Sequence, residues 1–169
     1  SFIIGSFRQW LDEYHVDGFR WDAVGAMRYY DPGHVNIPQA DSLIQYVNST
    51  IIHSDHPGAI SIAEDQSSGM NFDGEWNRSF GDTLIGQVVQ PTDSARDMNA
   101  LCNKMNGSGF FRVLYDETHD LTGNTGAYRL PYRIQPADPT SYYARKRSML
   151  ATAVVFTTPG IPMLFMGQE

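Results

Sequence analysis

The chain has 169 residues, a length typical of one domain or of part of one. It is 41% hydrophobic and 18% charged, which is typical of a globular protein with a sizeable core. A net charge of -7 without a stripe of Lys and Arg argues against a nucleic-acid partner, and the single cysteine, Cys102, excludes an internal disulfide. No apolar run approaches the roughly 18 residues that a membrane span needs, so we expect no membrane partner.

The first third of the chain predicts a helix that leads directly into a strand. Residues 6–15 carry large apolar side chains at helical spacing, and residues 16–22 (VDGFRWD) have the bulky residues that favour a strand. An irregular connection over 25–40 follows. The next helix is predicted over 42–53, with Asp41 as its N-cap. A helix that runs straight into a strand is typical of α/β folds.

The rest of the chain repeats this alternation. The strand at 59–63 is almost continuously apolar, as in parallel sheets that are buried on both faces. A long Gly/Pro-bearing loop precedes the last helix, in which we expect the basic triplet 145–147 to form a solvated face. We therefore predict an α/β fold with parallel strands at 59–63, 71–76, 110–115 and 161–166, helices at 79–89, 94–105 and 141–157, and the loop at 121–140.

The strand at 16–22 ends in a pair of opposite charges. Side chains alternate along a strand, so Gly18, Arg20 and Asp22 share one face. Arg20 would keep Asp22 ionised by placing a fixed cation beside it. An ionised, oriented carboxylate at a strand end is a candidate nucleophile. The alternative is a structural ion pair.

Two further strands also end in acids. Glu64 follows the strand 59–63, and Asp120 follows 110–115 with His119 beside it. Active sites of parallel α/β sheets and (β/α)8 barrels lie at this end of the strands. Retaining cleavage of a glycosidic bond needs two carboxyl groups about 5–5.5 Å apart, one ionised and one protonated at the outset. Asp22 suits the first role. Glu64, on a mostly apolar strand, suits the second.

Under this chemistry Asp120 and His119 would hold sugar hydroxyls in the transition state. The alternative is a metal-dependent hydrolase that uses His119, Asp120 and Glu64. It lacks support from the sequence, because no HxH or HExxH spacing is present.

Three stretches resemble signature stretches of the α-amylase family of glycoside hydrolases and transferases, in the order of that family: GFRWDAV at 18–24, SIAED at 61–65 and ETHD at 117–120. The closing PGIPMLFMGQE at 159–169 is similar to the last barrel strand of the family. The resemblance covers nearly the whole chain. It implies the C-terminal part of a (β/α)8 barrel, from the fourth strand to the eighth, so that residues 1–169 would form a partial catalytic domain without the N-terminal strands or any C-terminal β-domain.

The resemblance implies a role for each candidate residue. Asp22 would be the nucleophile, Glu64 the general acid/base and Asp120 the transition-state stabiliser. Arg20 would orient Asp22, and His119 would bind the sugar ring. These roles agree with those argued from the strand ends.

The stretches DAVGAM, IAED with FDGEWN, and MLFMGQE look most like those of glycogen-branching enzymes. In that subgroup Trp76 would sit at the end of the sixth strand and contact substrate. Ala26 stands where some amylases carry a histidine, which also favours the branching type. The partner would be an α-glucan such as starch, glycogen or a maltooligosaccharide, and a branching type favours a cytoplasmic location.

Several departures from the family leave alternatives open. The first signature of the family and the first three barrel strands are absent from this chain. The missing N-terminal half of the barrel would therefore be a partner of the chain. The calcium site of the family draws on those segments, and we assign no cofactor and no metal. An amylase-type hydrolase of starch or glycogen is the alternative activity. In the alternative of another class, the chain is an incomplete, non-catalytic fragment, because an unclosed barrel has two open edges.

Overall fold

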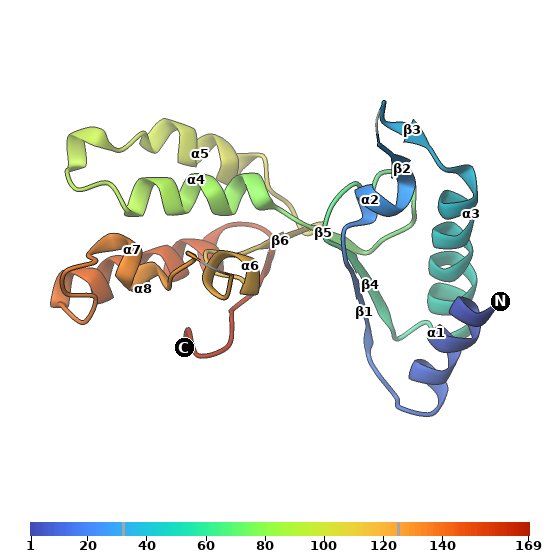
Figure 1. Cartoon of the computed structure of the whole chain (residues 1–169). Helices are drawn as coiled ribbons and strands as arrows, with labels where there is room; N and C mark the ends of the chain where they lie inside the picture. Colours follow the sequence, from blue (N-terminus) through green and yellow to red (C-terminus); the bar gives the residue numbers. More distant parts are fainter. Residues whose placement is uncertain (32, 125) are drawn as a thin grey trace. The chain divides into compact units, whose positions relative to one another are not determined.

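The computed structural model describes residues 1–31, 33–124 and 126–169 (Figure 1). The chain divides into two compact units, Ser1–Trp76 and Asn77–Glu169. Each unit contains parallel strands connected through helices, as the alternation of the sequence predicts.

The first unit opens with α1 (Phe2–Asp12) and β1 (Gly18–Trp21). The helix begins earlier than predicted, because the Ser1 hydroxyl accepts a hydrogen bond from the backbone N–H of Ile4. In β1 the glycine is required by close packing. A Cβ atom at Gly18 would lie 2.1 Å from the carbonyl oxygen of Ile60 on the neighbouring strand.

The register of three parallel strands sets where the acids of this unit emerge. β1 pairs with β4 (Ile60–Ala63), and β4 pairs with β5 (Gly74–Trp76). Trp21 lies opposite Ala63 in this register. The next residue of each strand therefore leaves the sheet at the same end. Those two residues are Asp22 and Glu64.

The connection predicted as irregular contains regular elements. It holds the short helix α2 (Val24–Arg28) and the antiparallel pair β2 (Tyr29–Tyr30) and β3 (Val35–Asn36).

The helix predicted over 42–53 is longer. α3 (Pro38–Tyr46) continues as the π-helix η1 (Val47–Asp55). The predicted N-cap at Asp41 is wrong: the helix starts at Pro38, and Asp41 instead accepts a hydrogen bond from Arg28.

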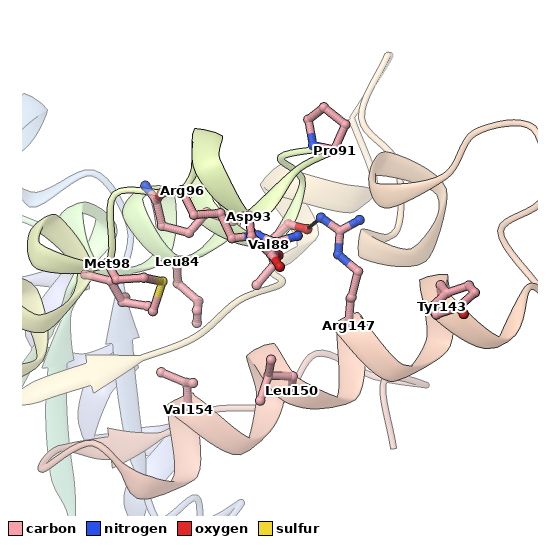
Figure 2. Close-up of a pocket in the computed structure, with 12 residues that line it drawn as sticks. Leu84, Val88, Pro91, Asp93, Arg96, Met98, Tyr143, Arg147, Leu150 and Val154 are labelled. Carbon is pink, nitrogen blue, oxygen red and sulfur yellow. Dashed lines mark hydrogen bonds and ion pairs between the residues drawn. The ribbon is translucent and has the colours of Figure 1, made fainter.

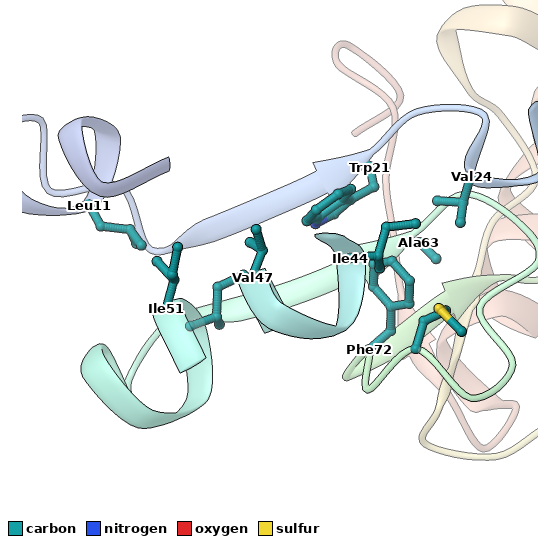
Figure 3. Close-up of a cluster of buried hydrophobic side chains, with 10 residues drawn as sticks. Leu11, Trp21, Val24, Ile44, Val47, Ile51, Ala63 and Phe72 are labelled. Carbon is teal, nitrogen blue, oxygen red and sulfur yellow. The ribbon is translucent and has the colours of Figure 1, made fainter. Parts of the chain in front are cut away.

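The core of the first unit lies between α1, α3 and one face of the strands (Figure 3). Trp21 is buried there, with its ring stacked on Phe7 at a centroid distance of 4.9 Å and edge-on to Phe72 at 5.7 Å. Burial of a side chain of this size contributes about 1.5–3 kcal/mol. Because neighbours on a strand alternate, burying Trp21 turns Arg20 and Asp22 away from this core.

The second unit has a core of its own, in which Phe80, Leu84 and Leu114 are fully buried. Its strands β6 and β7 are parallel, with Val113 opposite Ile161. The helix predicted over 94–105 begins later, because the Asp97 carboxylate caps it by accepting from the N–H of Ala100 at 2.9 Å. The elements are α4 (Arg78–Val88), η2 (Asp93–Ala95), α5 (Met98–Asn106), β6 (Arg112–Leu114), α6 (His119–Thr122), α7 (Leu130–Ile134), α8 (Tyr142–Thr157) and β7 (Ile161–Pro162).

The predicted loop 121–140 thus contains the helix α7, and the last strand is shorter than predicted. Residue 125 of that loop lies outside the described residues. None of the helices in the described part of the chain is long and apolar enough to cross a membrane.

Candidate active site

One guanidinium group in the first unit contacts both predicted catalytic carboxylates of that unit. Nη1 of Arg20 donates to Oδ1 of Asp22, and its Nη2 lies 3.0 Å from Oε1 of Glu64. The Arg20 Cζ also lies over the Trp76 ring, 4.4 Å from the ring centroid. Arg20, Asp22, Glu64 and Trp76, predicted from separate stretches of sequence, therefore form one cluster.

The members of this cluster differ in exposure. The Asp22 side chain is 77% exposed, whereas those of Arg20 and Glu64 are 26% and 27% exposed. An arginine held between an indole face and two carboxylates has little freedom to move, and cation–π contact adds to the two ion pairs. The Asp22 carboxylate is therefore accessible to a ligand, while the Arg20 guanidinium that orients it is held by Trp76 and Glu64.

The surroundings of Glu64 are more polar than its apolar strand suggested. Besides the contact of Oε1 with Arg20, its Oε2 accepts a hydrogen bond of 2.6 Å from the backbone N–H of Ala23. Ala23 follows the nucleophile candidate and adopts a left-handed conformation, with φ 45° and ψ 51°. Each carboxyl oxygen offers two lone pairs, so these contacts leave positions for a proton.

The remaining predicted site residues belong to the second unit, where they lie at the start of α6. The Thr118 hydroxyl caps that helix by accepting from the N–H of Leu121 at 3.2 Å. Nε2 of His119 is 3.5 Å from Oδ2 of Asp120, whose Oδ1 accepts from Asn124 at 3.2 Å. The two residues are half exposed. That Asp120 joins Asp22 and Glu64 stays a prediction.

Two buried acids that the sequence analysis gave no role precede this pair. Glu117 accepts hydrogen bonds of 2.5 Å from Nη1 of Arg129 and from the N–H of Leu130. Asp116 accepts from Gln168 and Thr152, and burial raises the pKa of Asp116 above its usual range. Both acids lie shortly after β6, beyond Tyr115, and they accept hydrogen bonds from side-chain and backbone groups of later segments of the chain. We therefore assign them a structural role.

A cavity of about 580 Å³ lies within the second unit between α4 and α8 (Figure 2). Most of its lining is apolar, and none of the predicted site residues lines it. Arg147 faces it and donates to the carbonyl oxygens of Val88 and Gln90, so the prediction of a solvated basic triplet is wrong at this position. Arginine at carbonyls that end a helix is a capping interaction. No group of three or more His, Cys, Asp or Glu that could hold a metal occurs in the described ranges.

No family model matches the chain, but its sequence is similar to those of several known enzymes. A 1,4-α-glucan branching enzyme GlgB of Nitrosococcus oceani is 29% identical over an alignment of 194 residues, which covers the whole chain and 25% of that enzyme. A malto-oligosyltrehalose trehalohydrolase of Saccharolobus solfataricus is 28% identical over 197 residues, covering the whole chain and 34% of the relative. The chain's relatives are members of the α-amylase family.

A solved structure confirms the fold. The cyclic α-maltosyl-(1→6)-maltose hydrolase from Arthrobacter globiformis matches with a TM-score of 0.68 at 20% identity, over 98% of this chain and 34% of the hydrolase. The chain spans a quarter to a third of the length of these curated relatives. The predicted resemblance to the α-amylase family is therefore confirmed, and so is an α/β fold of parallel strands alternating with helices, as in part of a (β/α)8 barrel.

Proposed function

We propose that the chain forms part of the catalytic domain of an α-glucan-active enzyme, which cleaves α-1,4-glucosidic bonds with retention and transfers the cleaved segment to a sugar 6-hydroxyl. The observation that carries this proposal is the contact of one guanidinium, that of Arg20, with the carboxylates of both Asp22 and Glu64. Retaining glycosidases place two carboxyl groups close together, and a shared arginine brings these two within reach of one sugar.

In the first step an Asp22 oxygen attacks the anomeric carbon while Glu64 gives its proton to the leaving glycosidic oxygen. The products are a glycosyl–Asp22 ester and a shortened glucan with a new hydroxyl group. In the second step Glu64, now ionised, takes the proton of the acceptor hydroxyl, whose oxygen displaces Asp22 from the anomeric carbon. The proton returns to Glu64, so the enzyme ends as it began.

The other predicted residues have supporting roles in this mechanism. Arg20 orients Asp22 through their ion pair, and Trp76 offers an aromatic face beside the two carboxylates. Asp120 and His119 would bind sugar hydroxyls and strengthen those contacts in the oxocarbenium-like transition state. The half-exposed state of both side chains is compatible with a ligand-binding role.

Hydrolysis is the second candidate activity. Water would replace the 6-hydroxyl in the second step with no change in the roles of Asp22 and Glu64. The relatives support this candidate, because a trehalohydrolase matches the chain about as well as a branching enzyme does. The two outcomes differ only in which acceptor reaches the glycosyl–Asp22 ester.

The test is incubation of amylose with the 169-residue chain and, separately, with the gene product that carries it. New α-1,6 branch points are counted after debranching, and free reducing ends are measured in parallel. We expect branch points to exceed new reducing ends, and Asp22→Asn to lower turnover by at least about 10³-fold, since a missing nucleophile closes the covalent route. Undiminished turnover by Asp22→Asn would contradict the nucleophile assignment. Reducing ends without branches would establish hydrolysis.

A further inference from the structure

The segment that carries Glu64 is held by a second segment just beyond the other catalytic strand. Three consecutive residues after β4 each receive a hydrogen bond from the α2 turn, which we define as residues 23–28. The three bonds run from the N–H of Ala23 to Oε2 of Glu64 at 2.6 Å, from the N–H of Gly25 to Oδ1 of Asp65 at 2.9 Å, and from Nη1 of Arg28 to the carbonyl oxygen of Gln66 at 2.5 Å.

The α2 turn is itself fixed at both ends. Val24 is fully buried and belongs to the core cluster of the first unit that is drawn in Figure 3. At the other end Arg28 is buried and pairs with Asp41, with Nε 2.7 Å from Oδ1. The packing of Val24 and the ion pair of Arg28 therefore hold the donors of the α2 turn in place.

The backbone is bent sharply on both sides of these contacts. Ala23 has φ 45° and Gln66 has φ 50°, a left-handed region that non-glycine residues seldom occupy. Backbone of this kind persists only where its surroundings over-determine it, and it concentrates at functional sites. Here the two left-handed residues lie one and two positions beyond the candidate catalytic carboxylates Asp22 and Glu64, respectively.

We propose that the α2 turn is a positioning clamp for the general acid/base, with Ala23, Gly25 and Arg28 as positioning residues that act through Glu64 and the two residues after it. This inference rests on the proposed function. The N–H of Ala23 holds Oε2 of Glu64 while Oε1 lies 3.0 Å from Nη2 of Arg20, so the two contacts together fix the orientation of the carboxyl group. The clamp thus sets the direction in which the proton is delivered.

Two substitutions weaken the clamp without touching the carboxylates of Asp22 or Glu64. Asp65→Ala removes the acceptor of the Gly25 N–H, and Asp65 is exposed, so its loss leaves the core intact. Gly25→Ala adds a Cβ that would lie 2.9 Å from Cγ of Gln66 and 3.1 Å from Oδ2 of Asp65, so these side chains must move, and the bond from the Gly25 N–H to Asp65 is disturbed. Matched controls are Asp55→Ala, which removes a surface partner of Arg8, and Gly5→Ala in α1, where nothing lies within 4 Å of the added atom.

The assay compares kcat/KM for amylose with kcat/KM for α-maltosyl fluoride, using the gene product that carries the chain. Fluoride leaves without a proton, so the first step on this substrate does not need Glu64 as an acid, whereas cleavage of amylose does. A misplaced acid lowers the first value and spares the second. General damage to the fold lowers both. Glu64→Gln is the reference, because it removes the acid itself.

We expect Asp65→Ala and Gly25→Ala to lower the amylose-to-fluoride ratio about tenfold, in line with the cost of misplacing a catalytic group by a fraction of an ångström. The controls should keep the ratio of the unmodified enzyme, and Glu64→Gln should lower it further than either clamp variant. An unchanged amylose-to-fluoride ratio in both clamp variants would overturn the clamp, whether the two kcat/KM values fall equally or do not fall at all. An unchanged ratio in Glu64→Gln would instead overturn the proposed function, since Glu64 would then not be the acid.

Discussion

The buried pair of Arg28 and Asp41 allows a quantitative test of what holds the α2 turn. Arg28 is 6% exposed and donates twice to Asp41, from Nε at 2.7 Å and from Nη2 at 3.5 Å, and once to the carbonyl oxygen of Gln66. A hydrogen bond to a charged group contributes about 1.5–3 kcal/mol, and removal of one partner of a fully buried ion pair costs about 3–5 kcal/mol.

The lower end of these values applies here. The Asp41 side chain is 20% exposed and keeps a hydrogen bond of 2.9 Å from Asn36 when Arg28 is lost. Methionine would retain most of the apolar stem of the arginine. We therefore expect Arg28→Met to lower the free energy of unfolding by about 3 kcal/mol and Asp41→Asn by about 2 kcal/mol. The double variant should lose only about 3 kcal/mol, because both changes break the same contact.

Urea unfolding followed by circular dichroism measures all four proteins of this cycle. The reasoning requires a coupling free energy of about 2 kcal/mol between the two positions. Strict additivity of the two single changes would refute it, because the pair would then contribute nothing of its own. A loss below about 1 kcal/mol in Arg28→Met would refute the burial argument as well.

Two further predictions concern the same unit. The hydrogen bond from Arg28 lowers the pKa of Asp41 below its usual 3.8. The ion pair therefore stabilises the folded state fully above pH 3.8, and this stabilisation is lost as the pH falls through the lowered pKa. The difference in unfolding free energy between the unmodified protein and Arg28→Met should thus shrink below about pH 4; a difference that stays constant down to pH 2 would contradict this. Gly18→Ala should cost about 3 kcal/mol or more, because its Cβ would lie 2.1 Å from a backbone oxygen that cannot move aside, whereas Gly5→Ala should not destabilise. Thermal unfolding of both variants decides this, and equal midpoints would be evidence against the required close packing.

Local pattern was enough to predict the two strands that end in the candidate carboxylates Asp22 and Glu64. Bulky, strand-favouring residues followed by an acid gave the ends of β1 and β4 to within about two residues. The expected burial on both faces is wrong for β4, because Ile60 is exposed and only Ser61 and Ala63 of this strand are buried. Alternation also placed Arg20 and Asp22 on one face of β1, and the structure confirms this, because Trp21 between them is buried in the core on the other face. These properties depend on neighbours in the chain, and the sequence contains them directly.

Helix ends and polar partners were predicted less well. Asp41 has the side chain of a good N-cap, but Arg28 pairs with it and the helix starts earlier, at Pro38. Arg147 belongs to a basic triplet, yet it caps α4 from nearly 60 residues away. In both cases a charged side chain binds a group that is distant in sequence. The free energy of such an interaction depends on how deeply the groups are buried, which the local sequence does not reveal.

The sequence alone determined which residue types stand at the strand ends and hence which chemistry they suit. Only the tertiary structure decided that one guanidinium contacts the carboxylates of Asp22 and Glu64, and that the N–H of Ala23 holds the second of them. The physical reason is that strand register and left-handed backbone arise from packing between segments some 40 residues apart. No local pattern records which residue faces which across such a distance.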